Sequence, residues 1–129
     1  KYNQSNLPGA ATHQALATGL TIGMRFHSAP VIRLGDAKAT GLGHVAKADG
    51  RWRIYAFCDR GDPAAPTSRI AALCSFLADG PDSPIRTYTP AGQDVDSVID
   101  LRAIFQQAHR DLDIGAMPAL LLPRKGRYG

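Results

Sequence analysis

The stretch RWRIYAF, residues 51–57, constrains the fold more than any other part of this sequence. Alternate side chains of a strand point to opposite faces, so Trp52, Ile54 and Ala56 would share one face. The other face would carry a mixture of basic and aromatic side chains, namely Arg51, Arg53, Tyr55 and Phe57. A strand that is apolar on both sides near its end is typical of a sheet covered by helices. The sequence therefore predicts an α/β layer arrangement.

The residues before this strand predict its partner. The dipeptide Asp49-Gly50 is of the type that closes tight hairpins, and the β-compatible run LGHVAKA, residues 42–48, precedes it. We therefore expect a β-hairpin between 42–48 and 51–57. As a hypothesis, Trp52 and Ile54 anchor the sheet to its covering helix.

Other helices and strands are predicted from the spacing of apolar residues and from the glycine, proline and capping residues that bound them. Val31 and Ile32 form a short predicted strand between a proline and a Gly-Asp turn signal. A helix is predicted over 67–78, because apolar residues recur at helical spacing and Thr67 or Ser68 can cap its start. The apolar stripe of this helix comprises Ile70, Leu73, Cys74 and Leu77, and Gly80-Pro81 ends it.

Two further segments are less clear in the sequence. The run IRTYT, residues 85–89, is bracketed by prolines and predicts a short strand. Residues 94–105 give conflicting signals, because their apolar spacing is helical whereas the runs VID and AIF have strand character. Periodicity alone does not decide between the two.

Length and charge set broad limits. A chain of 129 residues is an ordinary size for one domain, and its formal net charge of +4 is modest, with a mild basic cluster at Arg124, Lys125 and Arg127. Residues 1–18 are typical of a connector, so the domain is expected to begin near Gly19. The abrupt end after MPALLLPRKGRYG suggests a chain cut short. No run is long enough to span a bilayer and no secretory signal is present, so a cytoplasmic location is expected.

The two cysteines match no redox or zinc motif. Cys58 and Cys74 are separated by fifteen residues and form no CxxC pair. Cys74 lies on the helical apolar stripe, where a buried and inert thiol is expected. A disulfide between the two is the less favoured state in the cytosol.

No catalytic, cofactor-binding or metal site is predicted from the residues. The four histidines, at positions 13, 27, 44 and 109, lie far apart and at no metal-ligand spacing. Ser28 and Ser75 lack a G-x-S-x-G elbow, and the glycines form no G-x-G-x-x-G after a strand. The remaining acidic candidates are expected at helix ends and in loops, where capping and solvation explain them: Asp79, Asp82, Asp94, Asp96, Asp100, Asp111 and Asp113.

The basic residues give no nucleic-acid signature. An RNA-binding sheet would need an RNP-like pattern or a basic helix, and neither occurs, so no nucleic-acid partner is expected. Arg25, Arg51 and Arg53 are interpreted as hydrogen-bonding to carbonyls or carboxylates for geometry, in preference to direct substrate contact.

The sequence resembles the C-terminal domain of the FAD-dependent aromatic hydroxylases of the phenol 2-monooxygenase group. The resemblance rests on the order GMRFHSAPVIR, LGHVAKADGRWRIYAFC, SVIDLRAIF and MPALLLPRKGRYG, and it covers nearly the whole chain. Within that group it is most similar to the members that act on 3-hydroxybenzoate. Its most specific pieces are Gly23-x-Arg25 with Pro30, and Asp49 to Arg53 leading into an apolar strand.

The resemblance implies a thioredoxin-like fold at 19–129 that lacks the redox CxxC. It implies that 98–105 is a strand, and we adopt that interpretation over the helical spacing. The expected parent enzyme uses NADPH, FAD and O2 to hydroxylate a phenolic ring such as 3-hydroxybenzoate or phenol. FAD and the substrate would be held by preceding domains, and this segment would support domain packing and a homodimer without a catalytic residue. The family continues beyond residue 129, which would leave a sheet edge uncovered here.

Two alternatives of other classes remain open. The chain could be a freestanding thioredoxin-like module that binds a protein partner. It could also be a thiol oxidoreductase that uses Cys58 alone, which would require an exposed thiol of lowered pKa. No neighbouring motif in the sequence favours that activity.

Overall fold

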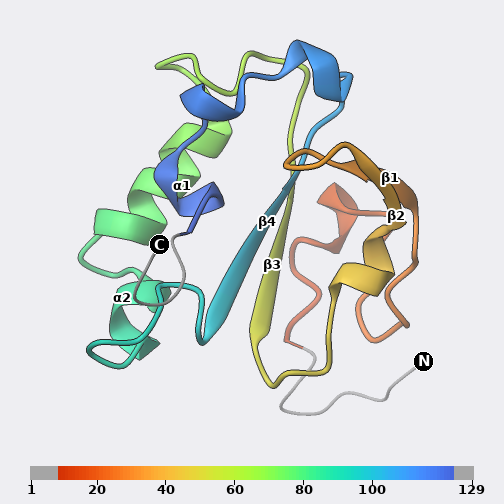
Figure 1. The fold of residues 1–129 in the computed structure, drawn as a ribbon. Helices are drawn as coiled ribbons and strands as arrows, with labels where there is room; N and C mark the ends of the chain where they lie inside the picture. Colours follow the sequence, from red (N-terminus) through yellow and green to blue (C-terminus); the bar gives the residue numbers. More distant parts are fainter. Residues whose placement is uncertain (1–8, 124–129) are drawn as a thin grey trace. The chain divides into compact units, whose positions relative to one another are not determined.

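The computed structural model describes residues 9–123, which divide into two compact units. Within the described range, unit 1 comprises residues 9–33 and 38–47, and unit 2 comprises residues 34–37 and 48–123. Figure 1 labels β1 and β2 of unit 1 and the helices and strands of unit 2. The basic cluster at Arg124, Lys125 and Arg127 and the polar start at 1–6 lie outside the described residues.

Unit 1 is built from a small hairpin and single-turn helices. Its elements are η1 (Gln14–Leu16), β1 (Pro30–Arg33), β2 (Lys38–Gly41) and η2 (Leu42–Val45). Strands β1 and β2 pair antiparallel, with Val31 opposite Thr40. The strand predicted at Val31 and Ile32 is therefore confirmed as β1. The predicted division into a connector at 1–18 and a domain from 19 onward stays a prediction.

Unit 2 has a parallel strand pair joined by helices. Strands β3 (Trp52–Phe57) and β4 (Ile99–Ile104) are paired in parallel, and α1 (Arg69–Asp79) and α2 (Pro84–Tyr88) lie between them in the chain. Three single-turn helices follow: η3 (His109–Asp111), η4 (Ile114–Ala116) and η5 (Ala119–Leu121). Parallel neighbours require such a crossover connection. The α/β class expected from the sequence agrees with this mixture.

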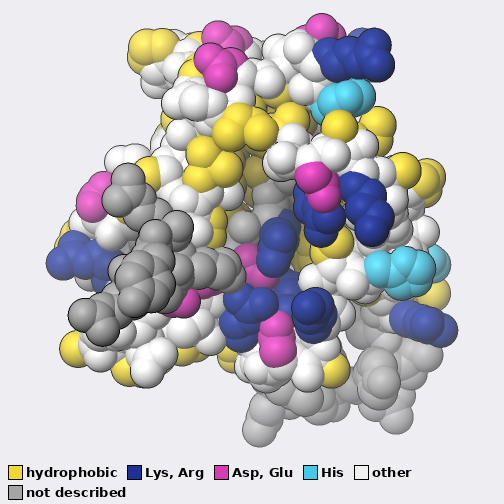
Figure 2. Space-filling model, in the orientation of Figure 1, with side chains coloured by type: hydrophobic (Ala, Val, Ile, Leu, Met, Phe, Trp, Pro, Cys, Tyr) yellow, Lys and Arg dark blue, Asp and Glu magenta, His cyan; other side chains and the backbone are white. Residues whose placement is uncertain are grey.

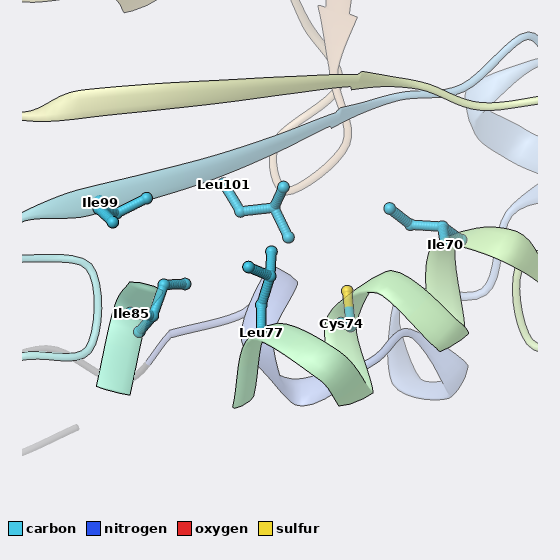
Figure 3. Close-up of a cluster of buried hydrophobic side chains, with 6 residues drawn as sticks. All are labelled: Ile70, Cys74, Leu77, Ile85, Ile99 and Leu101. Carbon is cyan, nitrogen blue, oxygen red and sulfur yellow. The ribbon is translucent and has the colours of Figure 1, made fainter. Parts of the chain in front are cut away.

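The core of unit 2 lies between β4 and the two α-helices. Figure 3 shows side chains from α1, α2 and β4 pointing into one cluster. Its buried members are Ile70, Cys74, Leu77, Ile85, Ile99 and Leu101. Ile54 and Ala56 of β3 are partly buried against the same cluster, so one face of the strand pair is apolar throughout.

The helix predicted over 67–78 is confirmed as α1, which begins two residues later and ends one residue later than predicted. The Ser68 hydroxyl accepts a hydrogen bond from the Ala71 amide at 3.3 Å, which satisfies a free donor of the first turn. Gly80 is the C-cap residue, and only glycine fits there because a Cβ would lie 2.5 Å from the Phe76 carbonyl oxygen. The strand adopted over 98–105 is confirmed as β4.

The predicted hairpin between 42–48 and 51–57 is wrong. Residues Leu42–Val45 form a single-turn helix, and β3 pairs instead with β4, far along the chain. The parallel partner presents Ile99 and Leu101 on the apolar face. It also supplies carboxylates near the arginines of β3, whereas 42–48 has no acidic residue. Long-range burial and charge pairing therefore outweigh the local turn signal.

The strand predicted at 85–89 is also wrong, because this segment forms the short helix α2. The Ser83 hydroxyl accepts a hydrogen bond from the Arg86 amide at 3.3 Å and donates one to the Leu77 carbonyl. Pro84 occupies the first turn, where a missing amide hydrogen costs nothing. The dipeptide Ser83-Pro84 was the sequence signal for this helix start.

The anchoring role of Trp52 is a further correction, because this side chain is 64% exposed. Trp52 is the first residue of β3. We therefore expect Trp52→Ala to change the free energy of unfolding by less than about 1 kcal/mol. Urea denaturation measures this value. A loss of about 3 kcal/mol or more, typical of a core aromatic, would contradict the exposed position.

Candidate functional site

Charged side chains gather on the face of β3 and β4 that points away from the helices. The register places Arg53 opposite Asp100 and Tyr55 opposite Arg102, so these residues share a face. In Figure 2, dark blue and magenta side chains lie interleaved near the centre of the view. We call the group formed by Asp49, Arg51, Arg53, Asp96, Asp100 and Arg102 the charge cluster.

Asp49 binds two arginines at the start of β3. The Arg51 Nη2 lies 2.8 Å from the Asp49 Oδ2, and the Arg51 Nε donates to the same oxygen at 2.9 Å. The Arg53 Nη2 lies 2.9 Å and 2.8 Å from the two Asp49 oxygens. The turn that was expected to close a hairpin therefore holds Arg51, which precedes β3, and Arg53 of β3 in place.

Asp96 and Asp100 bring the second strand into the cluster. The Arg51 Nη1 donates to the Asp96 Oδ2 at 3.1 Å and to its carbonyl oxygen at 3.3 Å. The Asp100 Oδ2 accepts from the Arg102 Nη2 at 2.7 Å, and the Arg53 Nε lies 3.7 Å away. The Asp100 side chain is only 4% exposed, so its charge is compensated by arginines rather than by water.

The arrangement shifts the ionisation of its outer members. The hydrogen bond from Arg51 holds the pKa of the Asp49 carboxyl well below its usual range. The same hydrogen bond raises the pKa of the Arg51 guanidinium above its ordinary value, because the Asp49 carboxylate stabilises its charged form. The cluster contains three arginines and three aspartates, so its formal charges cancel. Such a group orients the two strands relative to each other.

A pH-dependent stability follows from Asp49. A carboxyl whose pKa is lowered by folding stabilises the fold above its unfolded pKa, 3.8, and loses that contribution as the pH falls toward its folded value. Asp49→Asn should therefore lower the urea midpoint at pH 7 and have progressively less effect below about pH 4. Denaturation at a series of pH values tests this. An equal effect at pH 7 and pH 2.5 would contradict it.

The interpretation of Arg51 and Arg53 as geometric hydrogen-bond donors to carboxylates is confirmed. The expectation that Asp96 and Asp100 are capping or solvated residues is wrong, since both are buried. Asp79 does end a helix, and the Asp113 carboxylate accepts from the Gly115 amide at 2.8 Å, as expected of a cap. The missed signal was an Asp within an otherwise apolar strand, VIDL, because such a charge must find a partner.

A cleft of about 300 Å³ lies at the carboxyl end of β3 and the start of α1. Its lining mixes apolar residues with a few polar ones, including Cys58, Asp59, Ser68, Arg69 and Gln106. Ser68 already caps α1, and the Gln106 amide donates to the Cys58 carbonyl at 2.8 Å. The polar groups are thus largely engaged in holding the local backbone.

The two cysteines are free thiols, so no disulfide joins them. Burial raises the pKa of the Cys58 thiol, with a further contribution from the Asp59 charge. Burial likewise raises the pKa of Cys74 to about 11. Cys74 lies in the core as expected, and the neutral Cys58 thiol donates weakly to the Ala56 carbonyl at 3.6 Å. Neither thiol has the lowered pKa of a redox nucleophile.

We therefore expect iodoacetamide to alkylate Cys58 more slowly than a free cysteine at pH 7.5, because the thiolate is the reacting form. Cys74 should react only after denaturation, since it is 3% exposed. Peptide mass spectrometry after timed labelling separates the two sites. A Cys58 rate at or above that of a free thiol would instead support the thiol oxidoreductase alternative.

The other polar candidates do not assemble a site. Among residues 9–123, no three His, Cys, Asp or Glu side chains are placed to hold a metal ion. Ser28 accepts from the Gly43 amide at 3.3 Å, which is a structural contact within unit 1. Over the same range, no helix is long and apolar enough to cross a bilayer.

Comparison with known proteins bears on the whole chain. The family model described as phenol hydroxylase, C-terminal dimerisation domain, matches residues 1–129. A 3-hydroxybenzoate 4-monooxygenase of Comamonas testosteroni is 58% identical over 128 residues, which is 99% of this chain and 20% of that protein. The FAD-dependent monooxygenase terD of Aspergillus terreus is 36% identical over 118 residues, 91% of this chain and 19% of that protein. The chain thus spans about a fifth of the length of these relatives.

Proposed function

Since the chain belongs to the phenol hydroxylase C-terminal dimerisation domain family, we propose that it is the non-catalytic, assembly-supporting domain of a FAD-dependent aromatic monooxygenase. The observation that carries this proposal is the family match across all 129 residues. The charge cluster supports it, because the pairs that Arg51 forms with Asp96 and Arg53 forms with Asp100 connect the segment of β3 to that of β4, which is a structural role. The resemblance found in the sequence is thereby confirmed at the level of the family.

The proposed reaction belongs to the whole protein. Its flavin, reduced by NADPH, would react with O2 and transfer one oxygen atom to a phenolic ring, with 3-hydroxybenzoate as the favoured substrate because of the 58% identical relative. The described residues do not fit FAD, because no glycine-rich phosphate loop follows β3 and the cleft at its end is small. FAD and substrate are therefore assigned to preceding domains, and no catalytic residue is assigned here.

We assign a thioredoxin-like fold to residues 19–129, with residues 98–105 as one of its strands. Support comes from the order β3, α1, α2, β4, with parallel pairing and an apolar face covered by helices. A parallel sheet of two strands is smaller than sheets that stand alone. Further strands from elsewhere in the protein would complete it, and the redox CxxC is absent from this sequence.

The partners proposed are the preceding domains of the same polypeptide and a second copy of it. The homodimer is supported by the description of the matching family as a dimerisation domain. A cytoplasmic location is likewise proposed for the whole protein, in keeping with its assignment to a family of flavin-dependent enzymes. Light scattering of the purified natural protein should give twice its polypeptide mass, whereas a monomer at micromolar concentration would contradict the assembly role.

The experiment that tests the proposal is the intact mass, under denaturing conditions, of the natural polypeptide. We expect a mass about five times 13.8 kDa, because the relatives are about five times longer than this chain. The same preparation should show the absorbance of an oxidised flavin. A mass near 13.8 kDa would overturn the hydroxylase assignment and favour a freestanding binding module.

A further inference from the structure

We draw no further inference here: the strongest candidate, the cleft at the carboxyl end of β3 and the start of α1, carries nothing because its Ser68 and Gln106 side chains already hydrogen-bond to the neighbouring backbone, and nothing among residues 9–123 shows what would occupy it.

Discussion

Leu77→Ala is expected to lower the free energy of unfolding of unit 2 by about 2–5 kcal/mol. Leu77 is 2% exposed and lies in the middle of the core, where side chains of α1, α2 and β4 meet (Figure 3). Truncation removes buried methyl groups and leaves a cavity that the rigid helix and strands cannot close. Urea denaturation of residues 1–129, followed by far-ultraviolet circular dichroism, measures the loss.

The neighbouring residue supplies the control. Phe76 belongs to the same helix but is 47% exposed, so Phe76→Ala should cost less than about 1 kcal/mol. A comparison of the two separates core packing from a general effect on helix propensity. Equal losses for the two variants would mean that α1 does not pack as described.

Asp100→Asn is expected to be the second most harmful change, with a loss of about 3 kcal/mol. The carboxylate is 4% exposed and faces Arg53 and Arg102, so its neutralisation removes the carboxylate partner of Arg102 and leaves Arg53 with Asp49 alone. The loss should fall at the lower end of the range for a broken buried pair, because Arg102 is 39% exposed and can be hydrated. The readout is again the urea midpoint at pH 7.

Asp82→Asn is the matched control, since Asp82 is exposed in the turn between the two α-helices. It should change the free energy of unfolding by no more than about 0.5 kcal/mol. If Asp100→Asn were as mild as this control, the charge cluster would be a surface feature of little energetic value. A destabilised but correctly folded Asp100→Asn protein would support its role in joining β3 to β4.

Much of the local structure could be predicted because its signals are close together in the chain. The apolar stripe from Ile70 to Leu77, the capping Ser68 and the terminating Gly80 lie within one short segment, and α1 formed as expected. Ser83-Pro84 was an equally local signal for α2, but the prolines around 85–89 were interpreted as strand boundaries. The signal for a helix was present in the sequence, but the flanking prolines were given more weight than the capping serine.

The charge cluster could be predicted only in part. Arginines at 51 and 53 implied carboxylate partners, and the Arg51 contact with Asp96 spans 45 residues. Their identity depended on the strand that pairs with β3, which no local pattern specifies. The burial of Asp100 within an apolar strand could have pointed to a paired charge, but not to which cation.

The sequence by itself determined the helix α1, the strand β1 and the family to which the chain belongs. Only the tertiary structure decided that β3 pairs in parallel with β4, that Trp52 is exposed and that Asp100 is enclosed by arginines. Caps and apolar stripes act over one or two helical turns, whereas strand pairing and burial depend on segments that folding brings together from about 45 residues away.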